Sequence, residues 1–99
     1  MTKKYILEGG NVRETDNLLE WAKALENTNR IVKQTELPNG KYISTVFLGI
    51  DHAFGQEKPL LFETMVFPKK GDWAELETER YSTIFEAELG HDVMVQKYT

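Results

Sequence analysis

The chain has 99 residues, which is enough for one hydrophobic core and too few for a second, so we expect a single domain spanning residues 1–99. Hydrophobic residues make up 40% of the chain and aromatic residues 11%, a composition typical of a folded globule rather than a disordered tail. The formal net charge of −4 argues against direct binding of nucleic acid through neutralised phosphates.

The composition also excludes several kinds of site. The chain contains no cysteine, so disulfide bonds, thiolate nucleophiles and cysteine-based zinc sites are excluded. No run of residues approaches the ~18 consecutive apolar residues that a membrane-spanning helix needs. The first ten residues become polar too quickly for a secretory signal peptide. We therefore expect a cytoplasmic protein with no membrane partner.

The N-terminal part of the chain predicts a strand followed by a helix. Residues 3–8 form a short apolar strand pattern that ends at Gly9-Gly10. Asn11 lies three residues before Glu14, which is the spacing of a capping box. Apolar residues then recur at helical spacing as far as Asn27, so the pattern predicts a helix over this segment.

The middle of the chain predicts three strands. Residues 30–37 and 41–50 flank Pro38-Asn39-Gly40, in which proline presets a turn and glycine accepts the left-handed backbone conformation. This pattern predicts a hairpin. Residues 41–50 are apolar on both faces in their second half, which indicates a central, covered strand. A further strand is predicted over residues 60–67.

The last part of the chain predicts a second helix. The acidic segment 73–80 is compatible with more than one structure. A helix begins near Ser82, because Thr83 and Glu86 fit the capping pattern. Gly90 either permits close approach of this helix to the sheet or ends the helix early. The order β-α-β-β-β-α predicts an α+β fold, with an antiparallel sheet of three to four strands and two helices on one face.

The chain's two histidines suggest one possible catalytic or metal site. His52, His91 and Glu63 would form a ligand set for zinc or iron, or an acid–base set, if the fold brought them together. No established metal-binding spacing is present, so we expect no metal ion, no cofactor and no catalytic residue. A competing interpretation makes Asp51 the residue that closes a turn and His91 a hydrogen-bonded residue at the core edge.

Glu63 is a carboxylate within an apolar strand, where it would be costly if buried without a partner. Arg80 can form a bidentate pair with it. Three interpretations stay open: Glu63 and Arg80 form a structural ion pair, Glu63 is an exposed charge on the strand face, or Glu63 is a functional residue. A small enzyme or a ligand- or metal-binding protein using His52, Glu63, Arg80 and His91 therefore stays open as an alternative.

Acidic side chains and aromatic residues are the candidates for contact with a protein partner, because acidic surfaces dock on basic grooves and aromatic anchors dominate interfaces. They fall in the acidic segment that begins at Asp72 and in the loop 51–55, together with the polar groups discussed above. The candidate binding residues are Asp51, His52, Phe54, Glu63, Asp72, Trp73, Glu75, Glu77, Glu79, Arg80 and His91.

Several short blocks in the second half of the chain carry a resemblance to a known family. The blocks are residues 45–52, Phe54-Gly55, residues 59–67, residues 80–83 and Gly90-His91. Their order resembles a widespread family of small phage and mobile-element proteins, most of them of unknown function. Phe47 stands where many members have tryptophan, a change that keeps an aromatic side chain.

Within that family the chain is similar to small type II-A anti-CRISPR proteins, which inhibit Cas9. The resemblance implies a phage or mobile-element counter-defence protein in the host cytoplasm. It would bind Cas9 or the Cas9–guide RNA complex stoichiometrically, or block guide loading. Cas9 holds its guide and target in basic channels, which suit an acidic partner. A phage scaffold or a regulatory interaction module is a further alternative, and the sequence leaves the oligomeric state open.

Overall fold

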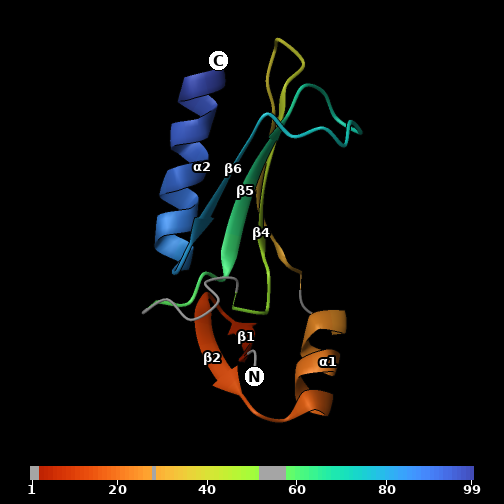
Figure 1. The fold of residues 1–99 in the computed structure, drawn as a ribbon, viewed down its shortest axis with the longest axis vertical. Coiled ribbons are helices and arrows are strands. Elements are labelled where there is room, and N and C mark those ends of the chain that lie inside the picture. The colour runs from red at the N-terminus through yellow and green to blue at the C-terminus, as the bar shows by residue number, and fades with distance from the viewer. Residues whose placement is uncertain (1–2, 28, 52–57) are drawn as a thin grey trace.

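The computed structural model describes residues 3–27, 29–51 and 58–99. Within these residues a four-stranded sheet carries a helix on one face, and a hairpin with a second helix lies at one end of it (Figure 1). The elements in chain order are β1 (Lys4–Glu8), β2 (Asn11–Thr15), α1 (Leu18–Asn27), β3 (Ile31–Glu36), β4 (Tyr42–Phe47), β5 (Phe62–Phe67), β6 (Glu77–Tyr81) and α2 (Ile84–Tyr98).

The four-stranded sheet has the order β3-β4-β5-β6 and is antiparallel throughout. The predicted turn at Pro38-Asn39-Gly40 joins β3 to β4. Gly40 adopts a φ of 91° and its N–H donates to the carbonyl of Leu37 at 2.9 Å. The expected α+β class and the antiparallel sheet of four strands are thus confirmed, with β4 at a central position. The acidic segment that the sequence left open supplies the edge strand β6.

The N-terminal region differs from the predicted order, because Asn11–Thr15 form a strand and not the first turns of a helix. Gly9 and Gly10 have φ values of 55° and 87°, which match the two-residue hairpin turn that pairs β2 with β1. The capping box predicted at Asn11 is therefore wrong. Asn17 caps the helix instead, since its Oδ1 accepts from the Glu20 N–H at 3.0 Å.

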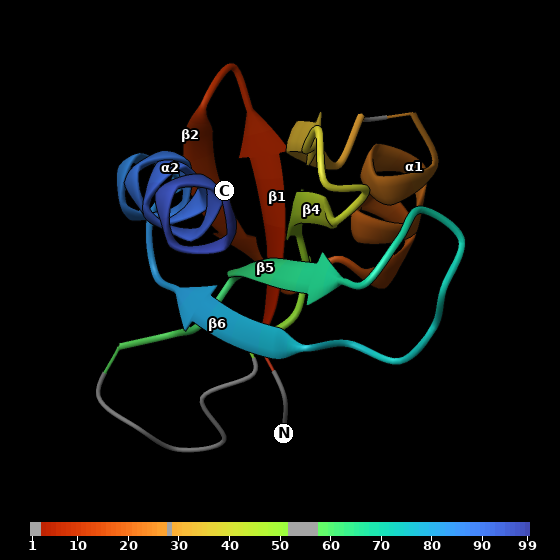
Figure 2. The ribbon, with the colours of Figure 1, turned by 90° about the horizontal axis from the view of Figure 1, so that it is seen from above.

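The two helices lie on different sheets, which corrects the prediction that both cover one face. Helix α2 packs across the four-stranded sheet, whereas α1 packs against β1 and β2 (Figures 1 and 2). The reason is the additional strand: β1 and β2 form a sheet of their own, and α1 follows β2 after two residues.

The hairpin is attached to the end of β4 through Gly49. The Gly49 carbonyl accepts from the backbone N–H of Tyr5 at 2.9 Å and from the indole N–H of Trp21 at 3.0 Å. Leu25 packs against the same glycine, where an added Cβ would meet its side chain. Because α1 has no fully buried residue, these contacts at Trp21 and Leu25 are important for holding the helix in place.

The core lies between α2 and the sheet, because alternate residues of β4 and β5 point toward the helix. The Phe47 and Phe62 rings are 5.3 Å apart between centroids, and both residues are buried. Ala87, His91 and Met94 fill the helix side of this layer. Two buried threonines, Thr45 and Thr64, and the buried histidine, His91, place polar atoms inside it.

Helix α2 begins and continues as the sequence predicts. Thr83 is its N-cap, with Oγ1 accepting from the Glu86 N–H at 3.1 Å. The helix runs through Gly90, where the ring of Tyr81 lies so close that a Cβ would overlap with it. Of the two interpretations of Gly90, close approach to the sheet is confirmed. Glycine in a helix costs about 1 kcal/mol relative to alanine, and this close packing against Tyr81 is the reason that glycine stands here.

Candidate functional site

His91, on the sheet-facing side of α2, is completely buried and contacts threonine hydroxyls from two strands. Its Nδ1 lies 2.7 Å from Thr45 Oγ1, and its Nε2 lies 2.9 Å from Thr35 Oγ1. Thr45 Oγ1 also lies 2.5 Å from Thr64 Oγ1. A neutral imidazole has one donor and one acceptor nitrogen, so hydroxyl groups can satisfy both. We call these four residues the His91 network.

The surroundings of His91 favour its neutral form. Burial lowers the pKa of His91 below its usual value of 6.5, and the positive charge of Lys33 lowers it further, whereas Asp92 raises it. The Lys33 ammonium lies 2.8 Å from Asp92 Oδ1. The imidazole is therefore the hydrogen-bonded histidine of the competing interpretation, and neither of its nitrogens faces solvent.

Glu63 lies on the opposite face of the sheet from the His91 network. It precedes Thr64 in β5, and successive side chains of a strand point to opposite faces. Its Oε2 accepts from Arg80 Nε at 2.9 Å, so an ion pair is present, but through this single hydrogen bond and not in the bidentate form that the sequence suggested. The sheet separates Glu63 from His91, and these two residues do not share a coordination shell. His52 lies outside the described residues.

The remaining predicted loop residues can be placed only in part. Asp51 Oδ1 accepts from the Leu60 N–H at 3.0 Å, so this carboxylate joins the two ends of the segment 52–59, as the turn-closing interpretation expects. Phe54, like His52, lies outside the described residues. Among the residues that are described, no group of three or more His, Asp or Glu side chains is arranged to hold a metal ion.

The acidic segment contains the most exposed aromatic side chain found in the described residues. Trp73 is 91% exposed. Asp72 Oδ1 accepts from the Ala74 N–H at 3.0 Å, which orders the backbone on both sides of the indole. Glu75 follows and is exposed. An indole presented in this way, between carboxylates, has no packing role inside its own domain.

The glutamates of β6 have different environments. Glu77 Oε1 accepts from Lys97 Nζ at 2.6 Å and from the Tyr98 hydroxyl at 2.7 Å, and these hydrogen bonds lower the pKa of the Glu77 carboxyl. Glu77 therefore ties β6 to the end of α2. Glu79 is exposed on the same edge strand. Arg80 points to the other face, where it binds Glu63.

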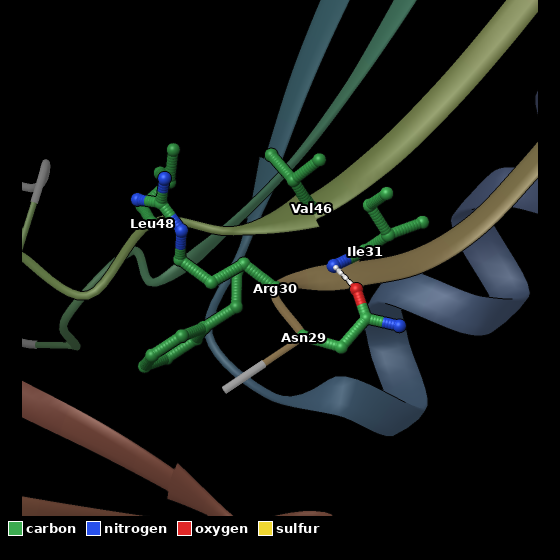
Figure 3. A pocket seen from close by; sticks show the side chains of 6 residues that line it. Asn29, Arg30, Ile31, Val46 and Leu48 are labelled. Atoms are coloured by element: carbon green, nitrogen blue, oxygen red, sulfur yellow. Dashed lines mark hydrogen bonds between the residues drawn. The ribbon is translucent and has the colours of Figure 1, made fainter. Parts of the chain in front are cut away.

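Surface grooves formed by the described residues accompany these side chains. The first, of about 390 Å³, lies between the start of β3 and the end of β4, where Asn29 Oδ1 accepts from the Ile31 N–H at 3.1 Å (Figure 3). The second, of about 430 Å³, surrounds the Glu63–Arg80 pair on the open face of the sheet. The third, also of about 430 Å³, lies between β6 and α2. We call it the β6–α2 groove.

Sequence reasoning missed an exposed apolar stripe along α2. Phe85, Leu89 and Val93 are 74%, 58% and 59% exposed, although they follow one another at intervals of four residues. This spacing places them on one face of the helix. The periodicity was available in the sequence, but the face that includes Ala87, His91 and Met94 has a similar apolar pattern and is the one that the sheet covers.

A comparison with protein-family models, with curated proteins and with solved structures finds no match for this chain. Within the described residues, no helix combines the length and the apolar character needed to cross a membrane. The function must therefore be argued from the charges, the exposed side chains and the grooves of the molecule.

Proposed function

We propose that this protein is a non-enzymatic counter-defence protein of a phage or mobile element. In this proposal it binds a CRISPR effector nuclease of the Cas9 type, alone or with its guide RNA, and inhibits it stoichiometrically. The resemblance of the second half of the chain and the net charge of −4 support this proposal. The single observation that carries the binding role is the almost complete exposure of Trp73 within an acidic segment.

The physical argument starts from the cost of an exposed indole. A tryptophan side chain can bury 150–250 Å² of surface, on the order of the largest contribution that one residue makes to an interface. Aromatic anchors of this kind dominate binding free energies. Asp72 and Glu75 flank Trp73, so the surface around the anchor is negative and complements a basic channel such as the one that holds guide and target in Cas9.

The geometry gives less support to the alternative of a small enzyme or ligand-binding protein. His91 is buried with both nitrogens engaged, and Glu63 is paired with Arg80 on the opposite face of the sheet. A general base has to reach a proton of the substrate at hydrogen-bond distance. His91 and Glu63 therefore do not open to solvent in a common cleft.

The test is a titration of the purified protein into a Cas9–guide complex, with cleavage of target DNA as the readout. We expect complete inhibition at one molecule of protein per nuclease. Trp73→Ala should weaken association about tenfold or more, the loss typical of an interface anchor. Leu18→Ala, which alters an exposed leucine of α1, is the matched control and should bind normally.

Two outcomes would contradict the proposal. The first is the absence of association with any Cas9, with or without guide RNA, in pull-down and gel-shift experiments. The second is inhibition at far less than one molecule per nuclease, because one molecule that disables many targets acts catalytically. Elemental analysis of the purified protein, together with His52→Ala and His91→Ala variants, would then test the enzyme alternative.

A further inference from the structure

The outer edge of β6 is an open strand edge. In the four-stranded sheet β6 is the last strand, and β5 is its partner on one side. Nothing in the described part of the chain pairs with its other side as a strand. Edge strands present a row of backbone N–H and C=O groups that can pair with another chain. This edge therefore offers main-chain hydrogen bonds to an incoming strand.

The β6–α2 groove lies between β6 and α2, and part of its lining is apolar. Leu89 and Val93 of α2 line it, and both side chains are more than half exposed. Gly90 and Tyr81 also line it, and the absent Cβ of Gly90 allows the strand and the helix to approach closely there. A strand added to β6 would direct alternate side chains toward these residues, because side chains alternate between the two faces of a sheet.

The charged residues that line the groove are mostly acidic. Glu77, Glu79 and Glu86 supply three carboxylates, and Lys97 supplies one ammonium, which already binds Glu77. Glu79 and Glu86 thus leave an excess of negative charge over the groove. An occupant of opposite charge would be attracted to it, and an acidic segment would be repelled.

A second copy of this chain fits the edge poorly. In a symmetric antiparallel pair of two β6 strands centred on Glu79, the two Glu79 residues face each other, and centring on Thr78 places Glu77 opposite Glu79. Like charges directly opposite each other destabilise a strand pair. The charges that oppose self-pairing favour a partner of opposite sign.

We propose that the β6–α2 groove binds an extended, basic segment of a partner protein, which adds to the sheet as a fifth strand beside β6. Backbone hydrogen bonds to β6 supply affinity, and alternate apolar side chains pack against Leu89 and Val93. Lysine or arginine side chains, interspersed with the apolar ones at the groove-facing positions of the segment, reach Glu79 and Glu86. This inference builds on the proposed function, because it names the form and the charge of the partner segment.

The experiment uses the full chain, labelled with ¹⁵N, and a fluorescent decapeptide as the probe. Every second residue of this peptide is in turn lysine or valine, with threonine between them, so that lysine and valine share one face of the strand; we call it the lysine–valine peptide. The controls are the same peptide with glutamate in place of lysine, and two lysine–valine peptides with N-methyl groups on alternate amides in the two possible phases. We expect the unmethylated peptide to shift the amide signals of residues 77–81 and 86–97. The peptide that is methylated on the amides facing β6 should lose binding, and the peptide that is methylated on the amides facing away should retain it. The glutamate peptide should not bind.

Variants on the surface of the groove complete the test. Leu89→Ser and Val93→Ser should each weaken the lysine–valine peptide about tenfold, as the loss of an apolar anchor does. Leu19→Ser is the matched control, since Leu19 is a similarly exposed leucine of α1. Glu79→Lys should weaken binding, whereas Glu26→Lys, at an exposed position of α1, should not.

The inference is overturned if both methylated peptides bind as well as their parent, if the signals shift at β3 instead, or if Leu89→Ser leaves binding unchanged. These results are distinct from a failure of the proposed function. Peptide binding without any Cas9 association overturns the proposed function and supports the groove assignment. Cas9 association without peptide binding, and without an effect of Leu89→Ser, overturns the groove assignment alone.

Discussion

Replacing Thr45 with valine should be strongly destabilising, although the two side chains have nearly the same shape. The Thr45 hydroxyl contacts two other members of the His91 network, His91 Nδ1 at 2.7 Å and Thr64 Oγ1 at 2.5 Å. All three residues are fully buried. Valine removes the hydroxyl without opening a cavity, so the change isolates the hydrogen bonds.

The expected size of the loss follows from the groups left without partners. Thr45→Val leaves the His91 nitrogen and the Thr64 hydroxyl unpaired, and each buried unsatisfied group costs about 1–3 kcal/mol. The additional methyl group offsets part of this cost, so we expect a loss of about 2–4 kcal/mol in the free energy of unfolding. For a domain of this size that corresponds to a drop in Tm on the order of 10–25 °C.

The matched variant is Thr64→Val, which leaves the Thr45–His91 hydrogen bond intact. We expect it to cost about 1 kcal/mol or less. The double variant Thr45→Val/Thr64→Val removes the orphaned hydroxyl as well, so it should be at least as stable as Thr45→Val alone. The two single effects are then non-additive by about 1–2 kcal/mol, which is typical of residues that share one network.

The assay is equilibrium unfolding in urea at pH 7.5, with circular dichroism as the probe and the slope of the transition as a control for compactness. Additive effects of the two substitutions would refute the reasoning. So would a loss below about 0.5 kcal/mol for Thr45→Val, because buried groups left unpaired cannot be that inexpensive.

Three further predictions concern other parts of the fold. The folded-state pKa of His91 is lowered, so the stabilisation from its neutral form is present above about pH 6.5 and is lost as the pH falls from there toward the folded pKa. The free energy of unfolding should fall with a slope of at most about 1.4 kcal/mol per pH unit. Urea unfolding from pH 7.5 to 5.0 should show this slope, and His91→Gln should remove it. Gly90→Ala should destabilise by about 1–3 kcal/mol, because the clash with Tyr81 exceeds the gain in helix propensity, and higher thermal stability of this variant would contradict the packing. Trp21→Phe removes the hydrogen bond to Gly49 and should lower the free energy of unfolding by about 1 kcal/mol. Amide hydrogen exchange should become faster in α1 and change little in β4 and β5; unchanged exchange in α1 would show that the indole does not anchor this helix.

The histidine and glutamate of the candidate site show how far sequence reasoning reaches. The sequence offered a Glu63–Arg80 ion pair as one of three interpretations, because a charge inside an apolar strand is costly without a partner, and the structure contains this pair. It could not decide whether Glu63 and His91 converge. That depends on which face of β5 the helix covers, and a shift of one residue in strand register would exchange the two faces.

Features set by neighbouring residues were predictable from the sequence by itself. The turn at Pro38-Asn39-Gly40 and the cap at Thr83 depend on backbone preferences and on hydrogen bonds within three residues. The absence of cysteine chemistry and the acidic charge follow directly from composition.

The tertiary structure alone decided the features that depend on long-range pairing. Asn11–Thr15 carry a helical pattern, yet pairing with β1 makes them a strand. The exposure of Trp73 and the open edge of β6 likewise depend on which segments happen to pack nearby. Local propensity is worth less than the hydrogen bonds and apolar contacts of a paired strand, so distant partners overrule it.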